Sequence, residues 1–301
     1  MNMRGFLGDL VGRAVVAAGV AMVAVAHAGD GIQEADGEPR PCEMRVESEL
    51  FENGGDAPTA RSLTVFDEGV AWDFLEMPAR KNQAMTVGEI VLHDPARERV
   101  LVIDPVRHLK TQIDSIRLER MSVSLAKWAR GNDDRLIRWA GGPDFTPGFT
   151  ETDTRIELAG PRVRYAVAYE EAPSPEAAGV YRQFADTAIL LKALMQPGGI
   201  PPFPRLAVNR RLEDAGAIPA EVTLEIDSRL TPIGRPERLR CVHTVHPRLL
   251  AGDRRRIEDA KAHIATSDTV DLATFVERES VRDADGSPEA NEPGRLETPG
   301  T

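Results

Sequence analysis

The stretch Thr86–Pro105, TVGEIVLHDPARERVLVIDP, holds two runs of Ile, Val and Leu, and each run ends in Asp-Pro. Aspartate at the first position of a turn and proline at the second favour a type I turn, because proline fixes φ at the value that its position requires. The dipeptides Asp94-Pro95 and Asp104-Pro105 are ten residues apart, which is the spacing of strands joined by hairpin turns. The stretch therefore predicts consecutive antiparallel strands.

The chain on both sides continues this pattern of short strands. Runs of β-branched, aromatic and aliphatic residues separated by Gly, Asn, Asp and Pro are typical of a meander. The first strands are predicted at Glu43–Glu52, Ala60–Phe66, Val70–Met77, Thr86–His93, Arg99–Asp104 and Arg107–Ile113. Later strands are predicted at Arg135–Trp139, Thr152–Leu158, Arg162–Tyr169, Arg205–Arg211, Ala220–Ser228, Glu237–His246 and Thr274–Arg278.

Helices are predicted where apolar residues recur at three- and four-residue steps. One follows Asp114 or Ser115, and a short one begins at Asp253. The longest begins at Ser174-Pro175-Glu176, and its apolar stripe favours core packing over a coiled coil because it is shorter than three heptads. Strands and helices do not alternate, so a parallel nucleotide-binding sheet is not expected. We predict an α+β protein with a curved antiparallel sheet, or half-barrel, packed on two or three helices.

The amino terminus has the three parts of a secretory signal. Arg4 and Arg13 supply the basic segment, Ala14–Ala26 is apolar, and Ala26-His27-Ala28 is a small-residue exit. An uncleaved anchor is the alternative, but a spanning helix needs ~20 apolar residues and this run is shorter. We expect residues 1–28 to be removed, leaving a periplasmic or secreted protein with no integral membrane segment.

Composition divides the remaining chain into three parts. Residues 29–41 are expected to form a flexible arm, 42–282 a single α+β domain and 283–301 a disordered acidic tail, because both ends lack apolar periodicity. The net charge of the whole chain is -11, and removal of the signal makes it one unit more negative. This charge disfavours binding to nucleic acid or to anionic lipid head groups.

The two cysteines of the chain are Cys42 and Cys241. In an oxidising compartment two cysteines can pair, and we predict a structural disulfide between them. Two free buried thiols are the alternative.

Catalytic and metal-binding motifs do not fit their expected surroundings. His243 and His246 form H-x-x-H, but in a strand this spacing points the two rings to opposite faces, and zinc needs three or four ligands. The aspartates near His93 and His108 are explained by the Asp-Pro turns. The chain has no Gly-x-Ser-x-Gly elbow, no H-E-x-x-H and no phosphate-binding glycine loop. We therefore expect no enzyme activity, no metal and no cofactor, although a fold-assembled carboxylate pair stays open.

Two segments offer candidate ligand contacts. Arg254-Arg255-Arg256 could grip a carboxylate or phosphate, but a solvated helix end is favoured. The connector PGGIPPFP, residues 197–204, carries Ile200 and Phe203, and is either a packed crossover or a semi-rigid flap over an apolar cavity. Trp72 and Phe74 are the candidate ligand contacts from the sheet.

The meander resembles that of the periplasmic lipoprotein carrier proteins. The resemblance rests on Val70-Ala71-Trp72-Asp73-Phe74, on IVLHDP at 90–95 and on VLVID at 100–104, and extends from Cys42 to Arg130. The chain is also similar to exported proteins of planctomycete type. The resemblance implies a curved antiparallel sheet that wraps over helices and encloses a cavity for acyl chains. The long helix after Ser174 and the acidic tail depart from the carrier family, so no ligand-contacting residue is transferred.

These observations lead to three functional hypotheses. The first is a non-enzymatic envelope protein that binds a lipophilic ligand, or the acyl group of an acylated protein, in an apolar concavity. The second is a scaffolding module whose sheet edges or disordered ends recruit another envelope protein. The third is a hydrolase whose active residues are assembled by the fold.

Overall fold

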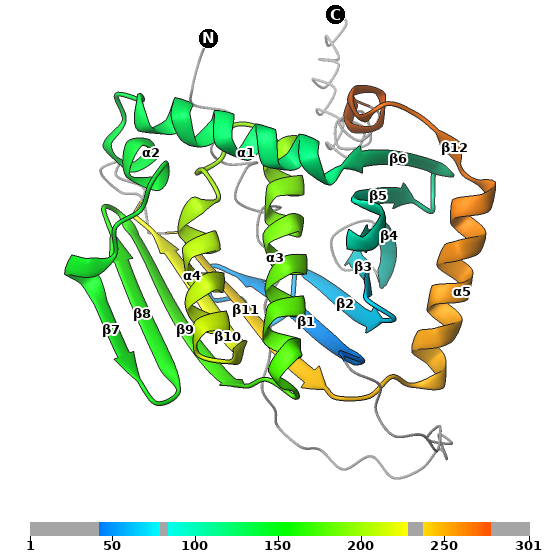
Figure 1. Ribbon diagram of the computed structural model, residues 1–301, viewed down its shortest axis with the longest axis horizontal. Coiled ribbons are helices and arrows are strands. Elements are labelled where there is room, and N and C mark those ends of the chain that lie inside the picture. The colour runs from blue at the N-terminus through cyan, green and yellow to red at the C-terminus, as the bar shows by residue number, and fades with distance from the viewer. Residues whose placement is uncertain (1–41, 79–83, 228–236, 278–301) are drawn as a thin grey trace, which may run out of the picture.

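The computed structural model describes residues 42–78, 84–227 and 237–277. The predicted signal, arm and acidic tail lie outside these residues. The strands are β1 Met44–Glu52, β2 Ala60–Asp67, β3 Val70–Pro78, β4 Met85–Asp94, β5 Arg99–Asp104, β6 Leu109–Asp114, β7 Phe149–Thr152, β8 Arg155–Gly160, β9 Val163–Glu171, β10 Ala217–Ile226, β11 Glu237–His246 and β12 Asp268–Thr269. The helices are α1 Ser115–Arg130, α2 Arg135–Ala140, α3 Pro175–Met195, α4 Phe203–Asp214 and α5 Ala251–Thr266 (Figure 1).

All of these strands belong to one open sheet of 12 strands, ordered β12-β6-β5-β4-β3-β2-β1-β11-β10-β9-β8-β7. Neighbouring strands are antiparallel except for β12, which is parallel to β6. The meander β1–β6 and the later strands meet where β1 pairs with β11, with Arg45 opposite His246 and Leu50 opposite Cys241. The prediction of an α+β protein with a curved, unclosed sheet is confirmed.

The two Asp-Pro turns form as predicted. The Asp94 carboxylate accepts a hydrogen bond from Arg97 N at 3.2 Å, and Asp104 accepts from Val106 N at 2.9 Å and Arg107 N at 2.7 Å. The same carboxylates also make ion pairs with neighbouring arginines, among them Arg107 at 2.6 Å from Asp104. The turn chemistry therefore fixes the ends of β4 and β5 with backbone and side-chain contacts together.

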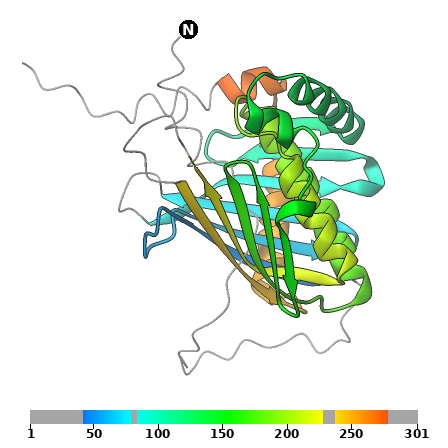
Figure 2. The same ribbon diagram turned by 90° about the vertical axis from the view of Figure 1, so that its left-hand side faces the viewer.

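The two faces of the sheet carry different helices. Alternate residues of β1 to β3, including Met44, Val46 and Phe66, are buried in one cluster with Tyr181 and Phe184 of α3, and we call this side the α3 face. Intervening residues of β2 and β3, among them Val65 and Trp72, are buried in another cluster with residues of α5, and we call that side the α5 face. Figures 1 and 2 show α3 and α4 running across the same side of the strands.

Three predicted strands are wrong, because these residues are helical. Arg135–Trp139 lies in α2, where the Asp134 carboxylate accepts hydrogen bonds from the backbone amides of Leu136 and Ile137. Arg205–Arg211 lies in α4, which begins after Pro202, and the segment from Thr274 lies in a helix at 272–277. A capping carboxylate or a leading proline selects the helix in segments whose apolar pattern fits both structures. Strands β7 and β12 were not predicted.

The predicted disulfide is also wrong, because Cys42 and Cys241 are not joined by a disulfide. Cys241 is buried opposite Leu50, whereas Cys42 precedes Met44 at the other end of β1. The strand from Met44 to Leu50 alone spans roughly 20 Å, and a disulfide needs Cα atoms within about 7 Å. The sheet register therefore keeps the two thiols apart.

Gly160 at the end of β8 provides the first test of the fold. A methyl group at this position would overlap the indole ring of Trp139. We expect Gly160→Ala to lower the free energy of unfolding by about 1–3 kcal/mol, the usual cost of overpacking, in urea titrations. Gly88→Ala in β4 is the matched control, because its methyl group would meet Met77 Cε at an ordinary 3.5 Å. Equal effects of the two substitutions would contradict the assigned packing of Trp139.

Candidate functional site

Trp72 and Phe74 are core residues on the α5 face. They are 6 % and 3 % exposed and lie in one buried cluster with Leu249, Ile257 and Ala260. The expectation that these aromatic rings line an open concavity is therefore not met, because α5 and the segment before it cover them. The sequence pattern correctly placed both rings on one face but could not reveal the helix above them.

The two candidates in the connector lie elsewhere. Ile200 packs against a different cluster, which includes Leu158 and Phe145, as a packed crossover would. Phe203 is the first residue of α4 and is half-buried. The structure therefore does not bring the four predicted ligand contacts together at one site.

A half-open pocket of about 410 Å³ lies between α4 and the β7–β8 hairpin, and we call it the α4–hairpin pocket. Its apolar lining residues are Pro143, Phe145, Phe149, Leu158 and Ala207, and its polar lining residues are Asp144, Thr146, Arg210, Arg211 and Asp214. Phe145 and Leu158 are buried and form the floor, whereas all five polar residues are exposed and form the rim. The pocket is thus apolar inside and charged outside.

Helix α4 shapes one wall of this pocket. Ala207, Arg210, Arg211 and Asp214 follow the three- and four-residue steps that place side chains on one side of a helix. The small side chain of Ala207 leaves space where a larger residue would fill the hollow. Arg211 places its guanidinium 4.7 Å from the ring centroid of Phe149, which holds the side chain against the opposite wall. These residues could not be predicted as a site from the sequence, because only the fold brings them together.

A second group of polar residues is buried beneath α3. Asp73, on the α3 face of β3, accepts hydrogen bonds from Ser62 Oγ at 2.5 Å and Thr64 Oγ1 at 2.7 Å. Burial raises the pKa of the Asp73 carboxyl to about 6, although the two hydroxyl donors oppose this change. Ser62, Thr64 and Asp73 are polar residues on the face of their strands that is otherwise apolar, and this pattern in the sequence could have indicated a buried polar group.

His243 links three elements within this group. Its Nδ1 lies 3.2 Å from Ser48 Oγ and its Nε2 lies 3.1 Å from the hydroxyl of Tyr181 on α3. Burial, together with the guanidinium of Arg205, lowers the pKa of His243 well below its usual range, so the ring is neutral. The serine–histidine pair is buried and does not line the α4–hairpin pocket, so the pocket gives a substrate no access to it.

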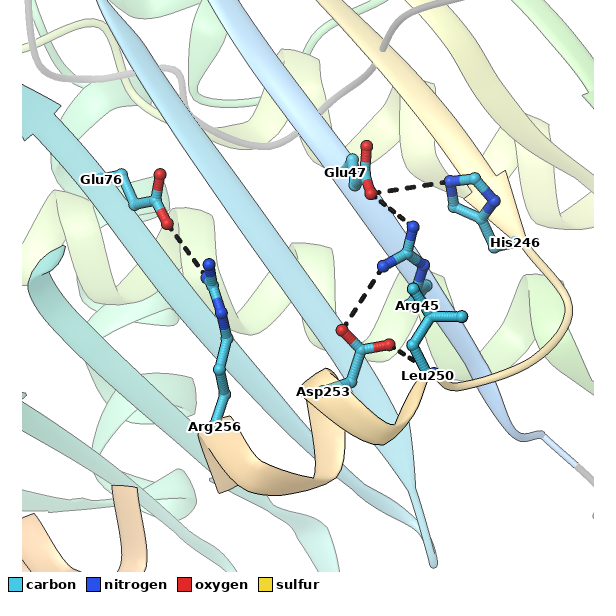
Figure 3. A network of polar contacts seen from close by, with 7 residues as sticks. All are labelled: Arg45, Glu47, Glu76, His246, Leu250, Asp253 and Arg256. Carbon is cyan, nitrogen blue, oxygen red and sulfur yellow. Dashed lines mark hydrogen bonds and ion pairs between the residues drawn. The ribbon is translucent and has the colours of Figure 1, made fainter. Parts of the chain in front are cut away.

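The remaining sequence candidates have structural roles. His243 faces α3, whereas His246 lies on the α5 face with its Nε2 3.8 Å from Glu47, so the prediction that H-x-x-H splits between two faces is confirmed. Arg254 pairs with Glu43 at 2.6 Å. Arg256 pairs with Glu76 at 3.0 Å (Figure 3). The basic run therefore attaches α5 to the sheet.

The start of α5 is anchored by a further polar network, drawn in Figure 3. Asp253 accepts a hydrogen bond from Leu250 N at 2.7 Å and a weaker one from Arg45 at 3.4 Å, and Arg45 also contacts Glu47 at 2.6 Å. These contacts hold the helix cap over β1 and so keep α5 above Trp72.

Comparison with known proteins gives no matching family model and no matching curated protein. Among the described residues, no three or more His, Cys, Asp or Glu side chains are grouped so that they could hold a metal ion. No helix in the described part of the chain is long and apolar enough to cross a membrane.

The pKa of Asp73 predicts a dependence of stability on pH. The pKa of Asp73 is near 6 in the folded state, against the usual 3.8. Its contribution to the free energy of unfolding is therefore fully present below about pH 4 and is lost as the pH rises through 6. Asp73→Asn removes the ionisable group. It should therefore raise the free energy of unfolding above that of the wild type by ~3 kcal/mol at about pH 7.5 and hardly at all at about pH 4. Urea unfolding at both pH values measures this difference. Asp259→Asn, on the exposed side of α5, is the control, and equal pH profiles for the wild type and Asp73→Asn would refute the assignment.

His93 should produce the opposite dependence. Burial lowers its pKa to about 4 from 6.5, and Thr187 Oγ1 of α3 lies 3.4 Å from its Nε2. Stability is therefore full above pH 6.5 and is lost as the pH falls through 4. We expect His93→Gln to lose less stability on acidification than the wild type, by ~3 kcal/mol at most. The measurement is again urea unfolding, with His263→Gln as control, and an unchanged loss on acidification would argue against a neutral buried ring.

Proposed function

We propose that the protein is an exported, non-catalytic binding protein whose ligand is a small lipophilic molecule held in the α4–hairpin pocket. The observation that carries this proposal is a half-open hollow of about 410 Å³ with Phe145 and Leu158 as its floor. Ligand pockets of ~300–1,000 Å³ with mostly apolar walls and a few polar groups are the usual small-molecule sites in proteins. The signal at residues 1–28 supports the periplasm or the outside of the cell as the place of action.

The finer architecture supports the same proposal. We interpret the open sheet as a half-barrel whose α3 face is packed on α3 and α4. Tyr181 and Phe184 of α3 share a buried cluster with Met44. Val208 and Leu212 of α4 share another with Leu50. This arrangement is in line with the resemblance to lipoprotein carriers. The ligand site proposed here differs from the one expected from the sequence, because the α5 face is covered and the α4–hairpin pocket is open.

Catalysis is not part of the proposal. Ser48 and His243 are 3 % and 1 % exposed, and Asp73 is 9 % exposed. A hydrolase would need a substrate to reach these groups, and the helix α3 contacts His243 directly through Tyr181. Binding without chemistry is therefore the simpler function for the open pocket.

Scaffolding is the second candidate function, and the surface of α1 favours it. Ile116, Val123 and Trp128 are 46 %, 71 % and 54 % exposed on this helix. Exposed apolar side chains gathered on one element are typical of protein contacts. A partner in the envelope would then bind at α1, away from the residues of the pocket.

Filling the pocket tests the binding function. Ala207→Phe adds a ring on the wall of α4, so we expect the affinity for the neutral fluorescent probe N-phenylnaphthylamine to fall at least about tenfold, a loss of ~1.4 kcal/mol. Fluorescence titration measures the affinity. Ala262→Phe on the exposed side of α5 is the matched control and should bind as the wild type does. Absence of probe binding to the wild type, or equal affinity of all three proteins, would reject the pocket as the site and favour the scaffolding function.

A further inference from the structure

The rim of the α4–hairpin pocket carries charges of both signs. Arg210 and Arg211 line it from α4, with Asp214 one turn further along, and Asp144 lines it from the loop before β7. All four side chains are exposed. Hydrogen bonds from Thr146 lower the pKa of the Asp144 carboxyl, so this group is ionised at neutral pH. The mouth of the pocket is therefore surrounded by two guanidinium groups and two carboxylates.

These charges are not paired with one another. Within the described chain, none of the four makes an ion pair, so each guanidinium nitrogen lies more than 4.0 Å from the nearest carboxylate oxygen. Elsewhere on the same half of the sheet, opposite charges do pair, as Arg155 and Arg164 do with Glu157 at 3.1 and 2.5 Å. Arg210 and Asp214 stand four residues apart on one helix, a spacing at which an ion pair could form. The four rim charges are therefore exposed and available to a charged ligand.

The charge pattern discriminates between classes of head group. An anionic head group would be attracted by the arginines but repelled by Asp144 and Asp214. A cationic head group would be attracted by the two aspartates but repelled by the arginines. A head with one negative and one positive group satisfies both signs at once. The planar guanidinium of Arg211, held against Phe149 at 4.7 Å, suits a phosphate or carboxylate, which it can bind through two N–H groups.

We infer that the ligand of the α4–hairpin pocket is a zwitterionic amphiphile, with its apolar chain on Phe145 and Leu158 and its head group between the arginines and the aspartates of the rim. This inference rests on the proposed binding function and adds the chemical class of the ligand.

Amphiphiles with one tail and different heads test the inference. Dodecylphosphocholine, dodecanoate, dodecyltrimethylammonium and dodecyl maltoside, each below its critical micelle concentration, compete with N-phenylnaphthylamine in low salt. Two exposed ion pairs should make the phosphocholine bind about tenfold more tightly than the neutral maltoside. Phosphocholine without a tail should show no measurable binding. Equal affinity for all four heads, or tightest binding of dodecanoate, would overturn the inference while leaving the proposed function intact.

Charge-removing variants locate the effect. Arg210→Gln with Arg211→Gln, and Asp144→Asn with Asp214→Asn, should each abolish most of the preference for phosphocholine, measured as the ratio of the dodecylphosphocholine and dodecyl maltoside affinities of the same protein. Arg255→Gln with Asp259→Asn removes one charge of each sign from the exposed side of α5 and should not change the preference. A preference that survives both rim variants overturns the inference. Failure of every amphiphile to bind, or binding of tail-free phosphocholine as tight as that of the amphiphile, contradicts the proposed function itself.

Discussion

The pairing of β1 with β11 is the interaction on which the rest of the molecule depends. It joins the meander to the later strands, and it brings together residues as far apart as Ser48 and His243, which are 195 positions apart in the chain. A shift of one residue in this pairing would turn Met44 and Val46 away from α3, because side chains alternate between the faces of a strand. The hydrogen bonds of His243 with Ser48 and Tyr181 fix both the register and the place of α3.

The geometry of the pocket follows from this arrangement. Helix α3, held on the sheet by Tyr181, in turn holds α4 through a hydrogen bond from Asn209 to Asp186 at 2.7 Å and an ion pair between Arg182 and Glu213. Helix α4 then sets the distance between Ala207 and the hairpin. The width of the pocket therefore depends on part-buried contacts between α3 and α4 that do not line it, so a change beneath α3 is felt at the ligand site.

Sequence reasoning succeeded where the cause of the structure is local. The Asp-Pro turns and the alternating strands of the meander were predictable because turn chemistry and period-two burial act within a few residues. The strand predictions for Arg135–Trp139 and Arg205–Arg211 failed, because their apolar patterns suit a helix as well as a strand. The disulfide prediction failed because the distance between the cysteines depends on the β1–β11 register. The pocket was out of reach, because Phe145, Leu158 and Arg211 come from a loop, a strand and a helix that only the tertiary fold assembles.

The two outermost strands have a consequence for how copies of the protein meet. Strand β12 has only two residues and runs parallel to its neighbour, and β7 has four residues that are nearly all exposed and polar. Open sheets risk polymerisation, because an unpaired outer strand is a template for a strand of the next molecule. Here each template is too short to hold more than a few backbone hydrogen bonds. A twelve-stranded sheet can thus remain open without growing into a fibre at high concentration.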